Sequence, residues 1–241
     1  MKKWLFLLLP LFIMMTWVGE ALTSSQFVVA TFSQQDTMAL GSADTGQPWN
    51  QFWYDPLDPD HTISLLGIQN NQAYCVTPNS SGGAWIDSLV SDGQTSLTAT
   101  YGDGGGVALD VRFFTDISNP TSPVVCGWQL LGTEGIGYYI IENNGDEALV
   151  NYRVPSVMPK DGDILSAIYS GSDINFYINN SIVYSGNDTN LTSNTVVGME
   201  IFSSGSNSSQ PYVSNFVCQS VDTNTPTLTL TPTPTVTPSG E

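Results

Sequence analysis

A short segment early in the chain combines aromatic rings with side-chain amides, in the order Trp49, Asn50, Gln51, Phe52, Trp53, Tyr54. An aromatic ring can stack on the apolar face of a pyranose, and planar polar groups beside it can bind the sugar hydroxyl groups. We expect Trp49 to be a core residue and Trp53 or Tyr54 to be exposed. Trp85 and Trp128 fall within expected strands and are predicted to be core residues.

Two pairs of polar residues sit at strand spacing further along the chain. Asp110 and Arg112 are two residues apart, and so are Asn151 and Arg153. Alternate residues of a strand point to the same side, so each pair is expected to share a sheet face and to offer charged and amide groups to a ligand. In the alternative reading Arg112 pairs with Asp110 or Glu142 and satisfies a buried carboxylate.

A third group of residues could hold a cation. Asp55, Asp58 and Asp60 crowd three carboxylates into a segment that contains two prolines. Oxygen ligands of this kind suit calcium, although the spacing is not that of an EF-hand. The sequence therefore allows a structural calcium site here, with a simply solvated acidic loop as the alternative. It indicates no other cofactor.

The usual catalytic groupings are missing from the sequence. His61 is the only histidine, so a Ser-His-Asp triad would have to use it, and no His/Cys cluster suggests zinc. Glu142 and Glu147 are separated by Asn143–Asp146, which is typical of a turn. These observations favour a non-catalytic protein.

The stretch from Asp161 to Ser185 gives the clearest indication of the kind of secondary structure that this chain forms. Ile174, Phe176 and Ile178 alternate with polar residues, which predicts a strand with one buried face. Asn179-Asn180 then predicts a two-residue turn, because Asn tolerates positive φ. Three short antiparallel strands are expected here.

The rest of the chain repeats this pattern of short strands. Roughly a dozen segments rich in apolar and β-branched residues are separated by Gly, Pro and Asn, and no segment keeps a helical period over three turns. The sequence predicts an all-β fold without substantial helix, a two-sheet antiparallel jelly-roll β-sandwich.

The two ends differ from this domain. Residues 1–21 have a basic start, an apolar run and small residues for cleavage, which predicts a secretory signal peptide, with an uncleaved anchor as the alternative. Residues 221–241 are rich in Thr and Pro, which is typical of an extended linker. The expected domain is therefore 22–220, secreted or at the cell surface, without membrane insertion once the signal is removed.

Charge and cysteine content narrow the class further. The formal net charge is −17, which disfavours binding to nucleic acid or anionic lipid and is compatible with neutral glycans or cations. Three cysteines allow one disulfide in a secreted protein. Cys75 and Cys218 lie in an early and the last expected strand, and the first and last strands of two-sheet sandwiches often pair. We therefore prefer a Cys75–Cys218 bridge with Cys126 as a buried free thiol, and the sequence leaves the other pairings open.

Several motifs recur in an order that resembles a known family. They are GIQNNQAY (67–74), AWI (84–86), GGGVALDVRF (104–113), the hairpins of 162–186 and YVSNF (212–216). Together they resemble the concanavalin A-like lectin/glucanase superfamily in its laminin-G-like branch, over about Phe27 to Gln219. The resemblance implies a jelly roll that binds carbohydrate, mediates adhesion or cleaves glycans. It also implies frequent calcium binding.

Glucanases of that superfamily carry a pattern like E-x-D-x-x-E on one strand, because a retaining glycosidase needs two carboxyl groups ~5–5.5 Å apart. No strand of this sequence offers that pattern. We therefore expect a non-catalytic carbohydrate-binding or adhesion module, with a glycan-cleaving hydrolase or lyase of the same fold, or a purely structural surface domain, as alternatives. The sequence does not specify the ligand or the oligomeric state.

Overall fold

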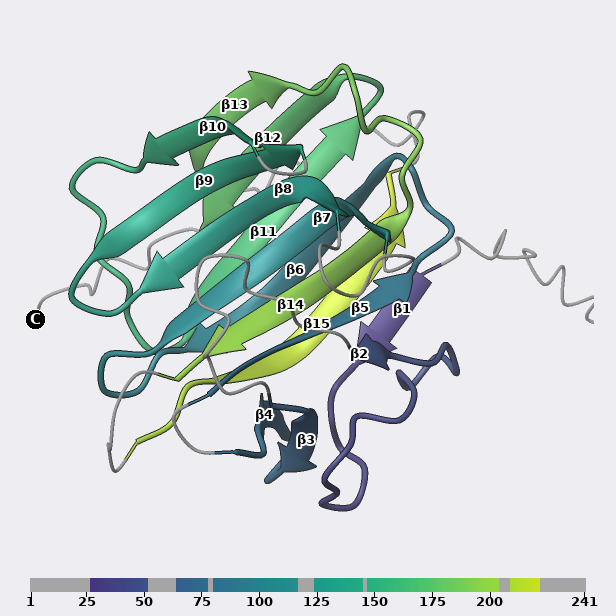
Figure 1. The fold of residues 1–241 in the computed structure, drawn as a ribbon, viewed down its shortest axis with the longest axis vertical. Helices are drawn as coiled ribbons and strands as arrows, with labels where there is room; N and C mark the ends of the chain where they lie inside the picture. The colour runs from purple at the N-terminus through teal and green to yellow at the C-terminus, as the bar shows by residue number, and fades with distance from the viewer. Residues whose placement is uncertain are drawn as a thin grey trace, which may run out of the picture.

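The computed structural model describes residues 27–51, 64–77, 80–116, 124–144, 147–203 and 209–221. These residues form fifteen strands in two antiparallel sheets, and none of them is helical (Figure 1). The two sheets are stacked face to face. The predicted all-β jelly-roll sandwich is confirmed.

Across the residues with described positions, no helix is long and apolar enough to span a membrane.

One sheet has eight strands, and its order is β13-β12-β11-β6-β15-β4-β3, with β1 also paired to β15. Their bounds are β1 Phe27–Ala30, β3 Leu66–Gln69, β4 Gln72–Cys75, β6 Gly93–Thr100, β11 Asp163–Ser170, β12 Asp173–Ile178, β13 Ser181–Asn187 and β15 Tyr212–Ser220. The first and last strands of the domain are therefore neighbours.

The second sheet has seven strands in the order β10-β9-β8-β7-β14-β5-β2 and lies in front in Figure 1. Their bounds are β2 Asn50–Gln51, β5 Ser81–Asp87, β7 Gly106–Asp116, β8 Val124–Thr133, β9 Gly137–Asn144, β10 Glu147–Arg153 and β14 Val196–Phe202. The face that points away from the eight-stranded sheet carries the candidate site.

The meander β11-β12-β13 follows from its sequence as expected. Ile174, Phe176 and Ile178 are buried on β12, and the residues between them are only half-buried. Asn179 and Asn180 have φ of 50° and 64°, so they form the tight turn into β13 with the positive φ that Asn tolerates.

The core fills the space between the two sheets. Val107, Leu109 and Val111 of β7 point into it, as does Trp128, which packs with Phe176 at 6.2 Å between ring centroids. Trp49 is buried and packs edge-on against Phe216. The prediction that Trp49 and Trp128 are core residues is correct.

The predicted disulfide is not formed, because Cys75 and Cys218 lie far apart. The strands that carry them are neighbours, but Tyr74 is opposite Tyr212, so Cys75 lies at the other end of β15 from Cys218. At ~3.3 Å per residue, the six residues from Tyr212 to Cys218 span about 20 Å, well beyond the reach of a disulfide. All three cysteines are free and buried, including Cys126, as predicted for that residue.

Candidate functional site: the outer face of the seven-stranded sheet

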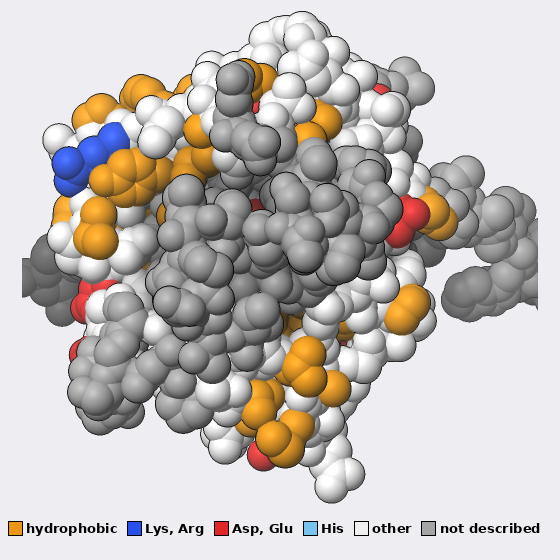
Figure 2. Space-filling model, viewed as in Figure 1, with side chains coloured by type: hydrophobic (Ala, Val, Ile, Leu, Met, Phe, Trp, Pro, Cys, Tyr) orange, Lys and Arg blue, Asp and Glu red, His pale blue; other side chains and the backbone are white. Residues whose placement is uncertain are grey.

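The register of the seven-stranded sheet brings polar and aromatic residues into two adjacent rows on its outer face. The first row runs across the sheet through Asn50, Trp85, Gly198, Asp110, Gln129, Ile141 and Asn151. The second row runs through Gly83, Glu200, Ala108, Leu131, Tyr139 and Arg153. Figure 2 views the molecule from the side on which this face lies. We call it the outer seven-stranded face.

A hydrogen-bonded cluster occupies the middle of this face. The Trp85 indole N–H donates to Asp110 Oδ2 at 3.0 Å, and the Gln129 amide donates to Asp110 Oδ1 at 3.0 Å. The same Gln129 nitrogen donates to Glu200 Oε2 at 2.8 Å. Four strands thus contribute one residue each to the central cluster (Trp85, Asp110, Gln129, Glu200), whose members are all buried.

Glycines allow aromatic rings to lie flat beside this cluster. A Cβ at Gly83 or Gly198 would overlap the Trp85 indole, and a Cβ at Gly127 would lie 2.5 Å from Phe113 Cδ2. The Trp85 and Phe113 rings stack with 5.0 Å between centroids and 5° between planes. The glycines on β5, β14 and β8 therefore make room for a two-ring platform.

Burial changes the acidity of the central carboxyl group. Asp110 is fully buried, and the loss of solvation raises its pKa to about 7, although the hydrogen bonds from Gln129 and Trp85 oppose this shift. The Asp110 carboxyl is therefore partly protonated near neutral pH. A group that titrates in this range can hold or release a proton close to a bound ligand.

The edge of this face toward β9 and β10 is accessible to solvent. Asn151 and Arg153 are exposed and share a side of β10, as predicted, while Tyr139 and Ile141 beside them are half-buried. The Arg153 guanidinium lies over the Tyr139 ring at 6.0 Å and donates to the Ile136 carbonyl at 2.8 Å. Figure 2 shows Lys/Arg side chains beside hydrophobic ones at this edge.

The prediction that Asp110 and Arg112 share a face is wrong. The register of β7 with β8 shifts between Val111 and Phe114, and Arg112 has φ of 51°. This β-bulge turns the Arg112 side chain away from Asp110. A strict period of two predicts side-chain direction only where the strand has no extra residue.

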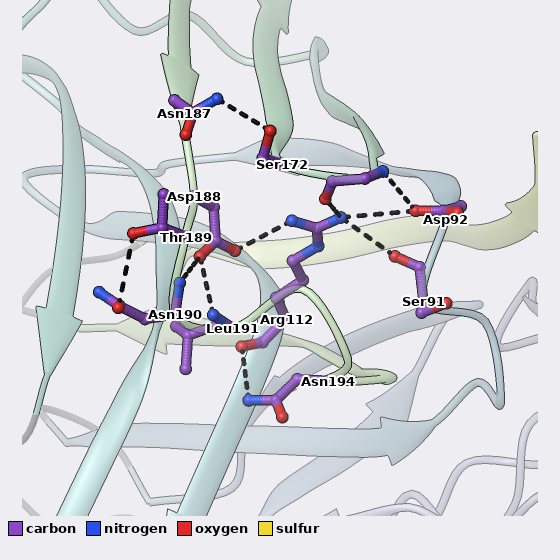
Figure 3. A network of polar contacts seen from close by, with 11 residues as sticks. Ser91, Asp92, Arg112, Ser172, Asn187, Asp188, Thr189, Asn190, Leu191 and Asn194 are labelled. Carbon is purple, nitrogen blue, oxygen red and sulfur yellow. Dashed lines mark hydrogen bonds and ion pairs between the residues drawn. The ribbon is translucent and has the colours of Figure 1, made fainter.

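Arg112 instead joins three loops at one end of the sandwich (Figure 3). Its side chain is fully buried and pairs with Asp188, with 3.0 Å between Nη1 and Oδ2. Its Nη2 donates to the Gly171 carbonyl at 2.6 Å and the Ser91 carbonyl at 3.3 Å. Nη2 also lies 3.6 Å from Asp92 Oδ1, so its carboxylate partners are Asp188 and Asp92 and neither Asp110 nor Glu142. Arg112 therefore has a structural role, as in the alternative reading, but with other partners.

Five of the predicted site residues lie outside the described residues: Trp53, Tyr54, Asp55, Asp58 and Asp60. Within the described ranges, no group of three or more His, Cys, Asp or Glu side chains could hold a metal ion. The calcium site and the aromatic loop therefore stay predictions.

Three members of the central cluster were not predicted as site residues. Trp85 was assigned to the core, and it is buried, but it lies on the outer face of its sheet. Gln129 and Glu200 come from strands distant in sequence, and only the strand register places them beside Asp110. Gly83 two residues before Trp85 is a local signal that the indole lies flat on the sheet.

The fold of this chain is shared with solved structures. No protein-family model matches the sequence, and no curated protein sequence matches it either. The structure is similar to a Bacillus licheniformis beta-glucanase, with a TM-score of 0.56 and 8% identity, over 83% of this chain and 100% of that chain. The fold is that of the jelly-roll glucanases and lectins.

Two further solved structures show the same likeness. A prokaryotic beta-1,3-1,4-glucanase (lichenase) derived from a mouse hindgut metagenome has a TM-score of 0.56 and 9% identity, over 81% of this chain and 99% of that chain. The carbohydrate recognition domain of Emp46p has a TM-score of 0.52 and 11% identity, over 72% of this chain and 89% of that chain. At these identities the likeness establishes the fold alone.

Proposed function

We propose that this domain binds a neutral glycan on the outer seven-stranded face and is not itself a catalyst. Proteins of the same fold include a lectin domain and glucanases, which supports carbohydrate as the ligand class. The net charge of −17 favours a neutral ligand over an anionic one.

The observation that carries this proposal is the accessible edge around β9 and β10. There an exposed guanidinium, an exposed amide and a half-buried aromatic ring lie side by side on one face, at Arg153, Asn151 and Tyr139. Such groups can bind sugar hydroxyl groups and stack on a sugar ring. Arg153 is held over Tyr139 by its hydrogen bond to Ile136, so little side-chain entropy is lost on binding.

The proposal includes the cellular setting that the sequence predicts. We infer a secreted module of the laminin-G-like branch whose Thr/Pro-rich segment 221–241 attaches it to another domain or to a surface. The predicted signal peptide and the motifs quoted above support this part.

A glycan-array screen of the protein from residue 22 to residue 241 tests the proposal. The strongest neutral ligand would then be titrated calorimetrically against Arg153→Ala and Asn151→Ala. Loss of a charge-assisted hydrogen bond of ~1.5 kcal/mol or more predicts at least a tenfold weaker Kd for Arg153→Ala. Lys160→Ala and Asn175→Ala are matched controls, since both residues lie away from this face, and they should bind as the wild type does.

One observation favours a second candidate function, hydrolysis of a glycan. Asp110 and Glu200 accept hydrogen bonds from one nitrogen, so these two carboxylate oxygens are at most about 6 Å apart, near the ~5–5.5 Å separation of a retaining pair. With a pKa of about 7, Asp110 could protonate the leaving oxygen while Glu200 attacks the anomeric carbon.

Binding fits the present arrangement better, because both oxygens of Asp110 are engaged by protein donors and the carboxyl group is fully buried. Incubation of the wild type with mixed-linkage β-glucan separates the two candidates. Release of reducing ends that Glu200→Gln abolishes would support hydrolysis, whereas binding without product supports the module.

A further inference from the structure

A groove lies on the eight-stranded sheet. It has a volume of about 450 Å³ and forms where the β3–β4 hairpin meets the start of β15. Ala73, Cys75 and Val213 of these strands point into the core, so the side chains between them point outward. The groove therefore opens away from the outer seven-stranded face.

The lining of this groove is uncharged and rich in amides. Gln69, Asn70, Gln72 and Gln210 line it together with Tyr74 and Tyr212. Each amide group can both donate and accept hydrogen bonds. Among the described residues, the structure records no hydrogen bond to any of these four amide side chains, so their capacity is available to a ligand.

The two tyrosines form a directly opposed cross-strand pair. Tyr74 of β4 lies opposite Tyr212 of β15, and both rings are half-buried. Opposed residues of an antiparallel pair have Cβ atoms ~4.5–5.5 Å apart, so both side chains extend from the same part of the sheet, and both line the groove. Gln72 is two residues from Tyr74 and shares its side of β4.

The walls of the groove are fixed before any ligand arrives. Asn70 and Asn71 form a turn with φ of 52° and 62°, and the Asn70 backbone N–H donates to Asp36 Oδ1 at 3.1 Å. On the other wall the Ser209 carbonyl accepts from the Asp103 N–H at 3.2 Å. A groove held in this way loses little entropy on binding.

We propose that this groove is a second glycan-binding site, specific for a neutral, polyhydroxylated chain. Aromatic rings beside unpaired amides match the apolar faces and hydroxyl groups of a neutral oligosaccharide. The lining has no cationic side chain to pair with the charge of an anionic one. The site is independent of the one on the outer seven-stranded face. With sites on both outer faces of the sandwich, one domain would bind two glycan chains and cross-link them.

The test uses the full-length protein with Arg153→Ala, so that the first proposed site is weakened, and cellohexaose as the probe. Tyr212→Ala should weaken the remaining binding at least tenfold. Gln72→Ala/Gln210→Ala, which removes only partly exposed amides, should weaken it severalfold with the melting temperature unchanged. Asn175→Ala, on the outer side of β12 in the same sheet, is the matched control and should have no effect.

Cross-linking gives a second readout. The unsubstituted protein should make a solution of long neutral β-glucan turbid. Either Arg153→Ala or Gln72→Ala/Gln210→Ala should raise the protein concentration needed for turbidity, because one of the two sites is weakened. A Kd for cellohexaose that stays within twofold in both groove variants would overturn the proposal. Equal binding of oligogalacturonate at the groove would overturn its specificity for neutral chains.

Discussion

Replacement of Arg112 by Met should destabilise the domain severely. The Arg112–Asp188 ion pair is fully buried, with 3.0 Å between its atoms, and Arg112 also donates to two loop carbonyls. Removing one partner of such a pair leaves a buried charge and costs ~3–5 kcal/mol. Because the whole stability of a domain is ~5–15 kcal/mol, this loss would be a large fraction of it.

The assay is urea unfolding at pH 7, followed by tryptophan fluorescence. Arg153→Met is the matched control, since Arg153 is exposed, and it should change the free energy of unfolding by no more than ~0.5 kcal/mol. Asp188 Oδ1 also accepts hydrogen bonds from the Asn190 and Leu191 N–H groups at 3.0 and 2.8 Å. The side-chain oxygen of an Asn at this position can accept both of these hydrogen bonds without a charge. Arg112→Met/Asp188→Asn should therefore be more stable than Arg112→Met.

A loss below ~1 kcal/mol in Arg112→Met would refute this reasoning. A variant that folds normally but binds glycan more weakly would restore Arg112 as a ligand-binding residue.

Three further predictions follow from buried groups. The pKa of Asp110 is raised to about 7 from a usual 3.8, so the native state binds a proton more readily than the unfolded state does. The stability that this group contributes is therefore greatest near pH 4 and is lost as the pH rises to 7. The free energy of unfolding, measured from pH 4 to 8, should show this slope in the wild type and not in Asp110→Asn. Gly198→Ala should cost ~1–3 kcal/mol by overpacking and should shift the Trp85 fluorescence, whereas Gly106→Ala, with its nearest contact at 3.3 Å, should cost less; equal costs would contradict the flat position of the indole. All three cysteines should react with a thiol reagent only after unfolding, since they are buried and free, and a disulfide-linked peptide in a non-reducing digest would contradict the structure.

The sequence predicted the architecture because its strands follow local rules. The alternation on β12 and the Asn179-Asn180 turn depend on neighbouring residues, and these gave the fold class, the meander and the core positions of Trp49 and Trp128. Asn151 and Arg153 were placed correctly on one face for the same reason.

The failures have one physical cause, which is register between strands distant in the chain. A β-bulge at Arg112 turns its side chain to the opposite face of the sheet from Asp110. The offset of β4 along β15 separates Cys75 from Cys218. The central cluster depends on the same kind of information, because Gln129 and Glu200 meet Asp110 only through the pairing of β8, β7 and β14. Local sequence patterns do not specify such pairings.

The most direct measurement of the central claim is an NMR titration of the isotope-labelled domain with its strongest neutral ligand from the array. The account predicts shifts of the Asn151 side-chain amide and of the backbone amides of β9 and β10 around Tyr139, at ligand concentrations near the calorimetric Kd. Shifts confined to the groove of Gln72 and Tyr212, with β9 and β10 unchanged, would contradict glycan binding on the outer seven-stranded face.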